Sequence, residues 1–365
     1  MAANLSVTFT GLHFDNPFLL SSAPPTESDS NIMRAFDAGW GGVVTKTIGL
    51  HPVTNVAGPK TKFLRSTLDG RLSMQKRPET SLHSSWNWEL ISDKPLDWWV
   101  PKIAGIKKQY PDRMLIASIM AGSGSDKELA HWQELAKACQ DVGADAFELN
   151  LSCPHMDRKD MGSNLGKDQE QVSIVTEVVK EVAKVPVWAK LTPSTTEIIE
   201  EAGAALRGGA DAIVSSNTFP SLPLIDPETL DFEMNVDGLV ASGGLGGPAI
   251  LPQSLAKMSQ LSTAFPDKEF SGIGGISTFA HALNYMLLGC GTVQVCTAAM
   301  LDRAIGPNII KGLIEGMQQF MEKRGYASLE DFRGLRRGNV VVHSQIRRPD
   351  GKEYHGGHEA EGYAS

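Results

Sequence analysis

Polar side chains stand at the ends of several apolar runs in this sequence. They are Ser22, Lys46, Asn150, Ser152, Lys190, Asn217 and Thr218. Burying hydrogen-bonding groups without partners costs about 1–3 kcal/mol each. Single residues of this set can pair with one another or with water. For the whole set, a polar ligand that satisfies these groups together is the economical explanation.

Two of these residues are lysines inside apolar runs, Lys46 in TKT and Lys190 in AKL. A lysine at such a position points towards an anion or an electron-rich heterocycle, or serves as a Schiff-base nucleophile. The alternative is a side chain whose charged end reaches back to the solvent at the rim. Two such lysines favour an anionic cargo.

A thiol is the candidate for proton transfer. Cys153 lies in NLSCPH, residues 150–155, before the loop sequence MDRKDMGSNLG. A thiol with a pKa of about 8.5 holds its proton at neutral pH and can still release it, so it can act as an acid or a base. An inert buried cysteine is the alternative, and it is how we interpret Cys139 and Cys290. His155 either tunes Cys153 or caps a turn.

Glycines in GIGGI, residues 272–276, suggest a phosphate site, and CTA at 296–298 follows the next apolar run. Glycine backbone lets N–H groups approach an anion, and a helix N-terminus adds its dipole. Tight turns without a ligand are the alternative for so short a motif.

Eight short apolar runs have the length of buried strands, and helical spacing separates most of them. The runs cover residues 17–23, 42–47, 115–120, 147–152, 187–192, 213–218, 270–276 and 293–298. The helical stretches cover 29–39, 97–109, 127–142, 168–184, 195–208, 250–263, 278–288 and 302–324. This alternation predicts an α/β fold, a (β/α)8 TIM barrel, over an open doubly wound sheet.

A weak internal repeat supports the barrel. GWGGVVTK, GADAFELN, GADAIVSSN and GCGTVQVC begin at residues 39, 143, 209 and 289. Each has a glycine that ends a helix, a turn of small residues and then a strand. In a barrel the polar strand ends converge on one mouth. Two long connections, 48–96 after strand 2 and 219–249 after strand 6, lie on the same side and would act as lids or binding loops.

We expect residues 1–325 to form the barrel with these insertions and residues 326–365 to form a polar, extended and weakly ordered extension. His355 and His358 could be taken as a metal pair, but they fit a solvated tail better.

The composition excludes several other functions. A net charge of −8 argues against nucleic acid or an anionic membrane as partner. The four cysteines form no CxxC pair, so we expect no zinc or iron–sulfur ligand set and no disulfide framework. Reduced thiols, the lack of a leader-like N-terminus and the lack of a long apolar run indicate a cytoplasmic protein.

Several motifs together resemble the flavin-dependent dihydropyrimidine and dihydroorotate dehydrogenases. They are TKT, WNWEL, ELNLSCPH, AKLTP, SNT, SGGLGGPAI, GIGGI and QVCTA, in this order from residue 45 to residue 298. The resemblance implies a barrel with FMN in its mouth, which agrees with the glycine motif and the two lysines.

The resemblance also implies roles for single residues. Positions that match FMN-binding residues are Ser22, Lys46, Thr47, Lys190, Gly247, Ile273, Gly274, Gly275, Cys296 and Thr297. Lys190 would lie near N1 and the C2 carbonyl of the flavin. Positions that match pyrimidine-binding residues are Asn87, Asn150, Ser152, Asn217 and Thr218, and Cys153 matches the catalytic acid/base. Hydride would pass from flavin N5 to C6 of the pyrimidine while Cys153 protonates C5.

Details of sequence favour the dihydropyrimidine branch. CPH stands where dihydroorotate enzymes usually have CPN, and no second cation for the orotate carboxylate is evident, which favours neutral rings such as uracil or thymine. The runner-up is a dihydroorotate dehydrogenase. A Schiff-base lyase using Lys190, or a silent binding subunit, is less expected.

The electron source and the assembly are further expectations. Without cysteines for iron–sulfur clusters, we expect NAD(P)H or another soluble donor or acceptor, or a separate electron-transfer subunit. Related barrels commonly pair, so a homodimer is expected.

Overall fold

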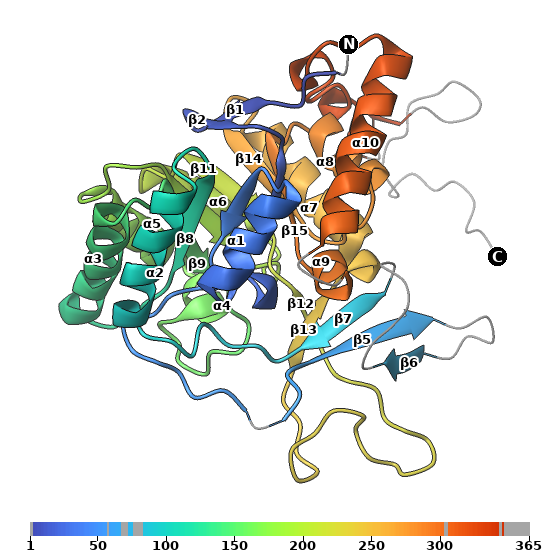
Figure 1. Cartoon of the computed structure of the whole chain (residues 1–365). Helices are drawn as coiled ribbons and strands as arrows, with labels where there is room; N and C mark the ends of the chain where they lie inside the picture. Colours follow the sequence, from blue (N-terminus) through green and yellow to red (C-terminus); the bar gives the residue numbers. More distant parts are fainter. Residues whose placement is uncertain are drawn as a thin grey trace, which may run out of the picture.

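A closed barrel of parallel strands forms the centre of the protein (Figure 1). The computed structural model describes residues 3–56, 58–66, 72–75, 83–302, 306–342 and 345–346. In these ranges the barrel strands are β3 (Phe18–Leu20), β4 (Gly42–Val44), β8 (Met114–Ile119), β9 (Ala146–Leu151), β10 (Val187–Leu191), β11 (Ala212–Ser215), β14 (Glu269–Ile273) and β15 (Thr292–Val295). Each pairs in parallel with its neighbours in chain order, and β15 closes the ring against β3. The predicted (β/α)8 barrel is confirmed.

Helices surround the strands as a continuous outer layer. In packing order they are α1 (Asp29–Ala38), α2 (Leu96–Gln109), α3 (Asp126–Asp141), α5 (Gln169–Lys180), α6 (Ile198–Arg207), α7 (Leu251–Ala264), α8 (Phe279–Leu287) and α10 (Pro307–Arg324), which returns to α1. Several begin at the side-chain caps that their sequences provide. Ser28, Ser125 and Asp168 each accept a hydrogen bond from a backbone N–H of the first helical turn.

The strands are shorter than their apolar runs. Every predicted strand is present, but five of them end three residues before the predicted limit. The residues beyond each end are the polar and glycine-containing stretches, such as Lys46–Thr47, Asn217–Thr218 and Gly274–Gly275. These residues do not pair with a neighbouring strand, because their polar groups face the barrel mouth.

The glycines of the internal repeat occupy equivalent places. Gly39, Gly143, Gly209 and Gly289 each follow a helix, with φ angles between 95° and 110°. Side chains other than glycine rarely adopt such angles, so glycine is required for the turn into the next strand.

The two long connections form one structure, although about 130 residues separate them in the chain. Residues of the first form β5 (Thr61–Ser66), β6 (Leu72–Gln75) and β7 (Ser84–Asn87), and residues of the second form β12 (Phe219–Ser221) and β13 (Gly243–Gly246). They pair as an antiparallel sheet in the order β12-β13-β7-β5-β6. Trp86, Trp88 and Met234 form a small apolar cluster of this second sheet. Figure 1 shows the sheet at one end of the barrel.

A short hairpin lies at the other end of the molecule (Figure 1). Its strands are β1 (Val7–Phe9) and β2 (Leu12–Phe14). Phe9 packs edge-on against Trp188 of β10, with 5.1 Å between ring centroids, and Trp188 Nε1 donates to Thr10 Oγ1. Phe9 and Trp188 are both fully buried, so the hairpin covers this end of the core.

The expectation of an extended segment from residue 326 onward is wrong for residues 326–339. Leu329 and Phe332 are buried, and the Phe332 ring packs against Phe320 of α10. Arg333 forms an ion pair with Glu269 and donates through Nε to the carbonyl of Gly289. The short helices η3 (Leu329–Asp331) and η4 (Arg337–Asn339) belong to this segment. His355 and His358 lie outside the described residues.

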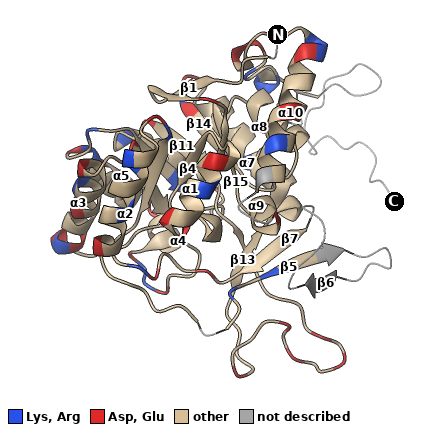
Figure 2. Ribbon diagram, viewed as in Figure 1, with Lys and Arg blue, Asp and Glu red and all other residues tan. Residues whose placement is uncertain are grey.

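Charged side chains mark the outer helices and loops, whereas the barrel strands carry few (Figure 2). The charged side chains inside the barrel are therefore exceptions that need an explanation.

Among the described residues, no helix is long and apolar enough to cross a membrane.

Replacing Phe9 by Ala is expected to lower the free energy of unfolding by about 3 kcal/mol or more, because it opens a cavity next to Trp188. Urea denaturation followed by tryptophan fluorescence measures the change. Thr8→Ala, at an exposed site on the same strand, is the control and is expected to change little. Equal stability of the two variants would show that the hairpin does not support the core.

Candidate active site

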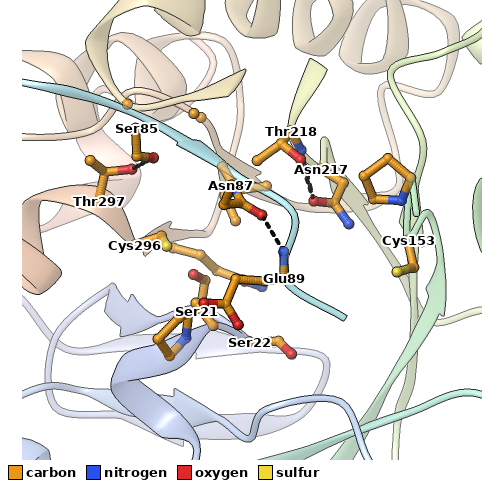
Figure 3. Close-up of a pocket in the computed structure, with 18 of the residues that line it drawn as sticks. Ser21, Ser22, Ser85, Asn87, Glu89, Cys153, Asn217, Thr218, Cys296 and Thr297 are labelled. Carbon is orange, nitrogen blue, oxygen red and sulfur yellow. Dashed lines mark hydrogen bonds between the residues drawn. The ribbon is translucent and has the colours of Figure 1, made fainter. Parts of the chain in front are cut away.

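A cavity of about 960 Å³, its open side included, lies at the carboxyl ends of the barrel strands (Figure 3). Barrel residues such as Lys46, Asn150 and Gly274 form part of its wall. Residues of the second sheet, such as Ser85, Asn87 and Gly246, form another part. The long connections therefore do contribute to the site, as their position after the strands predicted.

All but one of the sequence-predicted site residues line this cavity. The lining residues are Ser22, Lys46, Thr47, Asn87, Asn150, Cys153, Lys190, Asn217, Thr218, Gly247, Ile273, Gly274, Gly275, Cys296 and Thr297. Ser152 is the exception, because it is fully buried behind the wall. The roles of these residues stay predictions.

Ser152 acts on the amides of its neighbours. Its backbone N–H and its Oγ both donate to Asn150 Oδ1, and Asn217 Nδ2 donates to Ser152 Oγ at 3.0 Å. Thr218 N–H donates to Asn217 Oδ1. These bonds fix which face of each amide is the donor and which is the acceptor, so Ser152 orients two candidate ligand-binding residues.

Thr47 connects three strand ends. Asn150 Nδ2 donates to Thr47 Oγ1 at 2.9 Å, and the same oxygen lies within hydrogen-bonding distance of Ser118 Oγ and Ser22 Oγ. A hydroxyl has one donor and two acceptor sites, so this network satisfies buried polar groups without a ligand. These strand-end groups therefore bond one another in the structure, and their roles towards a ligand stay predictions.

Lys46 is paired with an acidic residue from the first long connection. Its Nζ lies 3.2 Å from Glu89 Oε2, and Thr61 Oγ1 donates to Glu89 Oε1. Both Lys46 and Glu89 line the cavity. Their charges offset each other where a ligand would lie.

Lys190 is paired below the cavity floor. Its Nζ lies 3.1 Å from Oε1 of Glu148, whose other oxygen accepts from Gln294 Nε2 at 2.7 Å. Glu148 is fully buried, and Lys190 is 4% exposed. Each lysine of the site thus has a carboxylate partner. The two lysines suggested an anionic ligand, but both of their positive charges are compensated in this pocket.

Glycines bring the backbone close to the cavity. Gly274, Gly275 and Gly247 have φ angles of 126°, 78° and 80°. A Cβ on Gly275 would lie 2.6 Å from Leu251 Cβ, and one on Gly247 would lie 2.8 Å from Ser84 Cα. Tyr285 fixes the turn by donating its hydroxyl to the Gly274 carbonyl at 2.7 Å. A side chain at Gly275 or Gly247 would thus collide with protein atoms, so glycine is required for the backbone to lie along the cavity wall. A glycine-rich backbone stretch of this kind fits a phosphate, which binds backbone N–H groups.

Cys153 is 5% exposed and lies on the wall beside Asn217, away from Cys296 (Figure 3). Burial raises the pKa of its thiol, although the His155 backbone N–H and the charge of Lys46 act in the opposite direction. The following loop is held by Arg158, which forms ion pairs with Glu128 and Asp160. The thiol is thus protonated at neutral pH and placed at the ligand space.

His155 lies on the same wall. Its Nδ1 is 2.9 Å from the Glu89 carbonyl, which can only accept, so Nδ1 carries the proton and Nε2 the lone pair. Burial lowers the pKa of His155. A neutral ring follows at physiological pH, so this histidine supplies no cation to the cavity.

Sequence reasoning missed several residues of the site. Glu89, Ser85, Ser21 and Gln294 line the cavity, and Glu148 lies beneath it. Glu89 and Glu148 stood in the motifs WNWEL and ELNLSCPH but had no assigned role. An acidic residue within an apolar strand run was the available signal for Glu148, since buried carboxylates need a partner.

The sequence itself matches a known family over most of the barrel. Residues 93–321, more than half of the chain, fit the sequence model described as dihydroorotate dehydrogenase. The chain belongs to the dihydroorotate dehydrogenase family. Within that family, the chain is similar to proteins named dihydropyrimidine dehydrogenase and to proteins named dihydroorotate dehydrogenase.

One relative is "Dihydropyrimidine dehydrogenase (NADP(+)), chloroplastic" of Arabidopsis thaliana, 38% identical over 94% of this chain and 79% of the relative. A second is "NAD-dependent dihydropyrimidine dehydrogenase subunit PreA" of Escherichia coli K12, 35% identical over 95% of this chain and 80% of the relative. A third is "Dihydroorotate dehydrogenase B (NAD(+)), catalytic subunit" of Pyrococcus furiosus, 31% identical over 91% of this chain and 98% of the relative.

These matches confirm the expected resemblance and its closer fit to the dihydropyrimidine branch. This member of the dihydroorotate dehydrogenase family is an oxidoreductase whose cofactor is FMN. The backbone of Gly247, Gly274 and Gly275 and the amine of Lys190 all line the cavity, and they suit the phosphate and the electron-rich ring edge of that cofactor.

Because burial raises the pKa of Cys153, the rate of its alkylation by iodoacetamide is expected to rise more steeply between pH 8.5 and 9.5 than that of a free thiol. A free thiol, with a pKa of about 8.5, gains less than twofold there, because its thiolate fraction rises from about one half to about nine tenths. Peptide mapping by mass spectrometry follows Cys153, with the urea-unfolded chain as control. The same relative rise in the folded and the unfolded chain would contradict the raised pKa.

Proposed function

We propose that this flavoprotein interconverts a neutral pyrimidine, such as uracil or thymine, and its 5,6-dihydro form. The observation that carries the proposal is the charge balance of the cavity. Lys46 is paired with Glu89 and Lys190 with Glu148. His155 is neutral because burial lowers its pKa. Among the described lining residues, no cationic side chain lacks an acidic partner.

Charge balance discriminates between the two substrate classes of the relatives. Dihydroorotate has a ring carboxylate, and an anion that leaves water needs a charged or multiply hydrogen-bonded partner. A carboxylate in this cavity would lie near Glu89 and would compete with it for Lys46. A neutral dihydropyrimidine ring meets no such opposition. The same observation disfavours the dihydroorotate alternative.

Amides supply the recognition that a neutral ring requires. Uracil-type rings alternate N–H and C=O groups, and each asparagine amide offers a donor and an acceptor. Asn87 Nδ2 donates to the Gly244 carbonyl, and its Oδ1 accepts from Glu89 N–H. Asn150 and Asn217 are oriented through Ser152. Fixed amides on both sides of the cavity therefore support pyrimidine binding by Asn87, Asn150, Asn217 and Thr218.

The residues that we propose for FMN are those predicted from the resemblance: Ser22, Lys46, Thr47, Lys190, Gly247, Ile273, Gly274, Gly275, Cys296 and Thr297. All of them line the cavity. When bound, FMN supplies two-electron hydride chemistry that side chains lack. Gly247, Gly274 and Gly275 would hold its phosphate, and Lys190 would stabilise negative charge on the ring.

Cys153 is the proposed acid/base. Its raised pKa keeps the thiol protonated at neutral pH, so it can deliver a proton to the ring carbon during reduction. In the oxidising direction the same sulfur accepts that proton.

The contacts of Lys190 argue against the Schiff-base lyase. A Schiff-base nucleophile must be a neutral amine. The Lys190 amine is instead held in an ion pair with a fully buried carboxylate.

The electron partner stays a proposal. The names of all three relatives mention NADP(+) or NAD, and the Escherichia coli and Pyrococcus furiosus relatives are called subunits. These names support NAD(P)H, used directly or through a separate electron-transfer subunit. The expected homodimer is a further proposal, which sedimentation velocity can test.

The substrate proposal predicts which compounds reduce the flavin. Under anaerobic conditions dihydrouracil or dihydrothymine is expected to bleach the FMN absorbance, and dihydroorotate to act at least tenfold more slowly. Stopped-flow absorbance at the flavin band measures the rates, with dithionite as the positive control. Bleaching by dihydroorotate alone would replace the proposal with a dihydroorotate dehydrogenase.

The acid/base role of Cys153 predicts that Cys153→Ala loses at least 100-fold in turnover while FMN stays bound. General acid–base catalysis typically contributes about 10²–10⁴-fold, which sets this scale. Cys153→Ser retains a proton donor and is expected to keep part of the activity, with a shifted pH profile. Unchanged turnover in Cys153→Ala would remove the proposed proton transfer.

A further inference from the structure

An acidic residue lies beneath the cavity without lining it. Glu148 of β9 is fully buried, and both of its carboxylate oxygens have partners on other strands. Lys190 of β10 lies 3.1 Å from one oxygen, and Gln294 of β15 donates to the other at 2.7 Å. The contact thus links three strands of the barrel interior.

The strand register explains how the pair forms. Lys190 lies opposite Asn150 in the β9–β10 pairing, and Glu148 lies opposite Trp188. Side chains two residues apart point to the same face of a strand. Glu148 therefore occupies the interior layer below Asn150, and the Lys190 side chain reaches down to it.

Stability alone is a weak reason for such a pair. Removing two charges from water costs several kcal/mol for each ion, and apolar residues of similar volume often replace a buried ion pair without loss of stability. A buried pair that includes a cavity-lining lysine is therefore a candidate for a functional role.

We propose that Glu148 is a positioning residue that offsets the charge of Lys190 and thereby lowers the reduction potential of the bound flavin. The inference rests on the proposed placement of Lys190 against the flavin ring. A nearby positive charge stabilises the extra electron density of the reduced ring, and a carboxylate 3.1 Å from the ammonium reduces that effect.

The other charged or titratable groups described near the cavity do not offset the charge of Lys190. Glu89 compensates Lys46 in the same way, at 3.2 Å. Burial raises the pKa of Cys296, so this thiol is neutral at pH 7. Cys153 is likewise protonated. Within the described residues, Glu148 is the acidic group in contact with Lys190.

The experiment measures flavin reduction in the FMN-loaded protein without any pyrimidine. Glu148→Gln removes the negative charge and keeps the size of the side chain. In an anaerobic titration against a reference dye of known potential, its ratio of reduced to oxidised flavin at a fixed potential is expected to exceed the parent ratio at least tenfold. For a two-electron couple, tenfold corresponds to about 30 mV.

Glu201→Gln is the matched control, because it makes the same substitution at a buried carboxylate that does not line the cavity. Its ratio is expected to stay within twofold of the parent. No rise, or a fall, in Glu148→Gln would overturn the proposal. An equal rise in Glu201→Gln would also overturn it, because the loss of a buried carboxylate far from Lys190 would then suffice.

A second variant covers a failure of Glu148→Gln to fold or to retain FMN. Glu148→Asp keeps the carboxylate but withdraws it by one methylene, so an intermediate rise of about threefold is expected. No rise in Glu148→Asp would overturn the proposal. Thermal melting and the FMN content of each variant show which variant folds and retains FMN, and that variant is used for the titration.

The outcome of the dye titration does not depend on whether the proposed substrate is correct. No pyrimidine takes part in the dye titration, so a flavoprotein with another substrate would still show the shift. Conversely, an unchanged potential would leave the bleaching of FMN by dihydropyrimidines unaffected. The two failures are therefore distinguishable.

Discussion

Two ammonium groups buried at one end of a closed barrel set the main electrostatic constraint on this protein. An isolated buried charge is too costly to keep, so each lysine requires a carboxylate within contact distance. Glu89 meets this need for Lys46, and Glu148 meets it for Lys190. The consequence is a cavity with strong local dipoles and little net charge, which suits a polar but uncharged ring.

The two carboxylates come from different parts of the architecture. Glu148 belongs to a barrel strand and lies below the cavity, whereas Glu89 follows β7 of the second sheet and lies on the cavity wall. Changes in the long connections can therefore alter the charge at the cavity wall without altering the charge beneath its floor. This division matches the general behaviour of barrels, in which loops vary the site and strands keep it rigid.

The second sheet ties the site together. Its strands β7 and β13 come from connections far apart in the sequence, and their pairing places Asn87 beside Gly244. Ser85 Oγ lies 2.9 Å from Thr297 Oγ1, which joins the sheet to the start of helix α9 (Thr297–Leu301), just after the last barrel strand. A wall built from both connections holds candidate pyrimidine-binding and FMN-binding residues in one rigid frame, and this order favours precise placement of reacting groups.

Local pattern was enough to predict the barrel, because apolar runs, helix caps and helix-ending glycines such as Gly39 and Gly209 act over a few residues. It also predicted several cavity-lining residues, such as Lys46, Asn150 and Asn217, since parallel strands put their carboxyl ends at one edge. Others, such as Asn87 and Gly247, were predicted only from the family resemblance. The contacts of Lys190 with Glu148, of Lys46 with Glu89, and of Ser152 with Asn217 were not predictable in this way. They join segments 42, 43 and 65 residues apart, and only chain closure and strand register bring such groups within hydrogen-bonding distance.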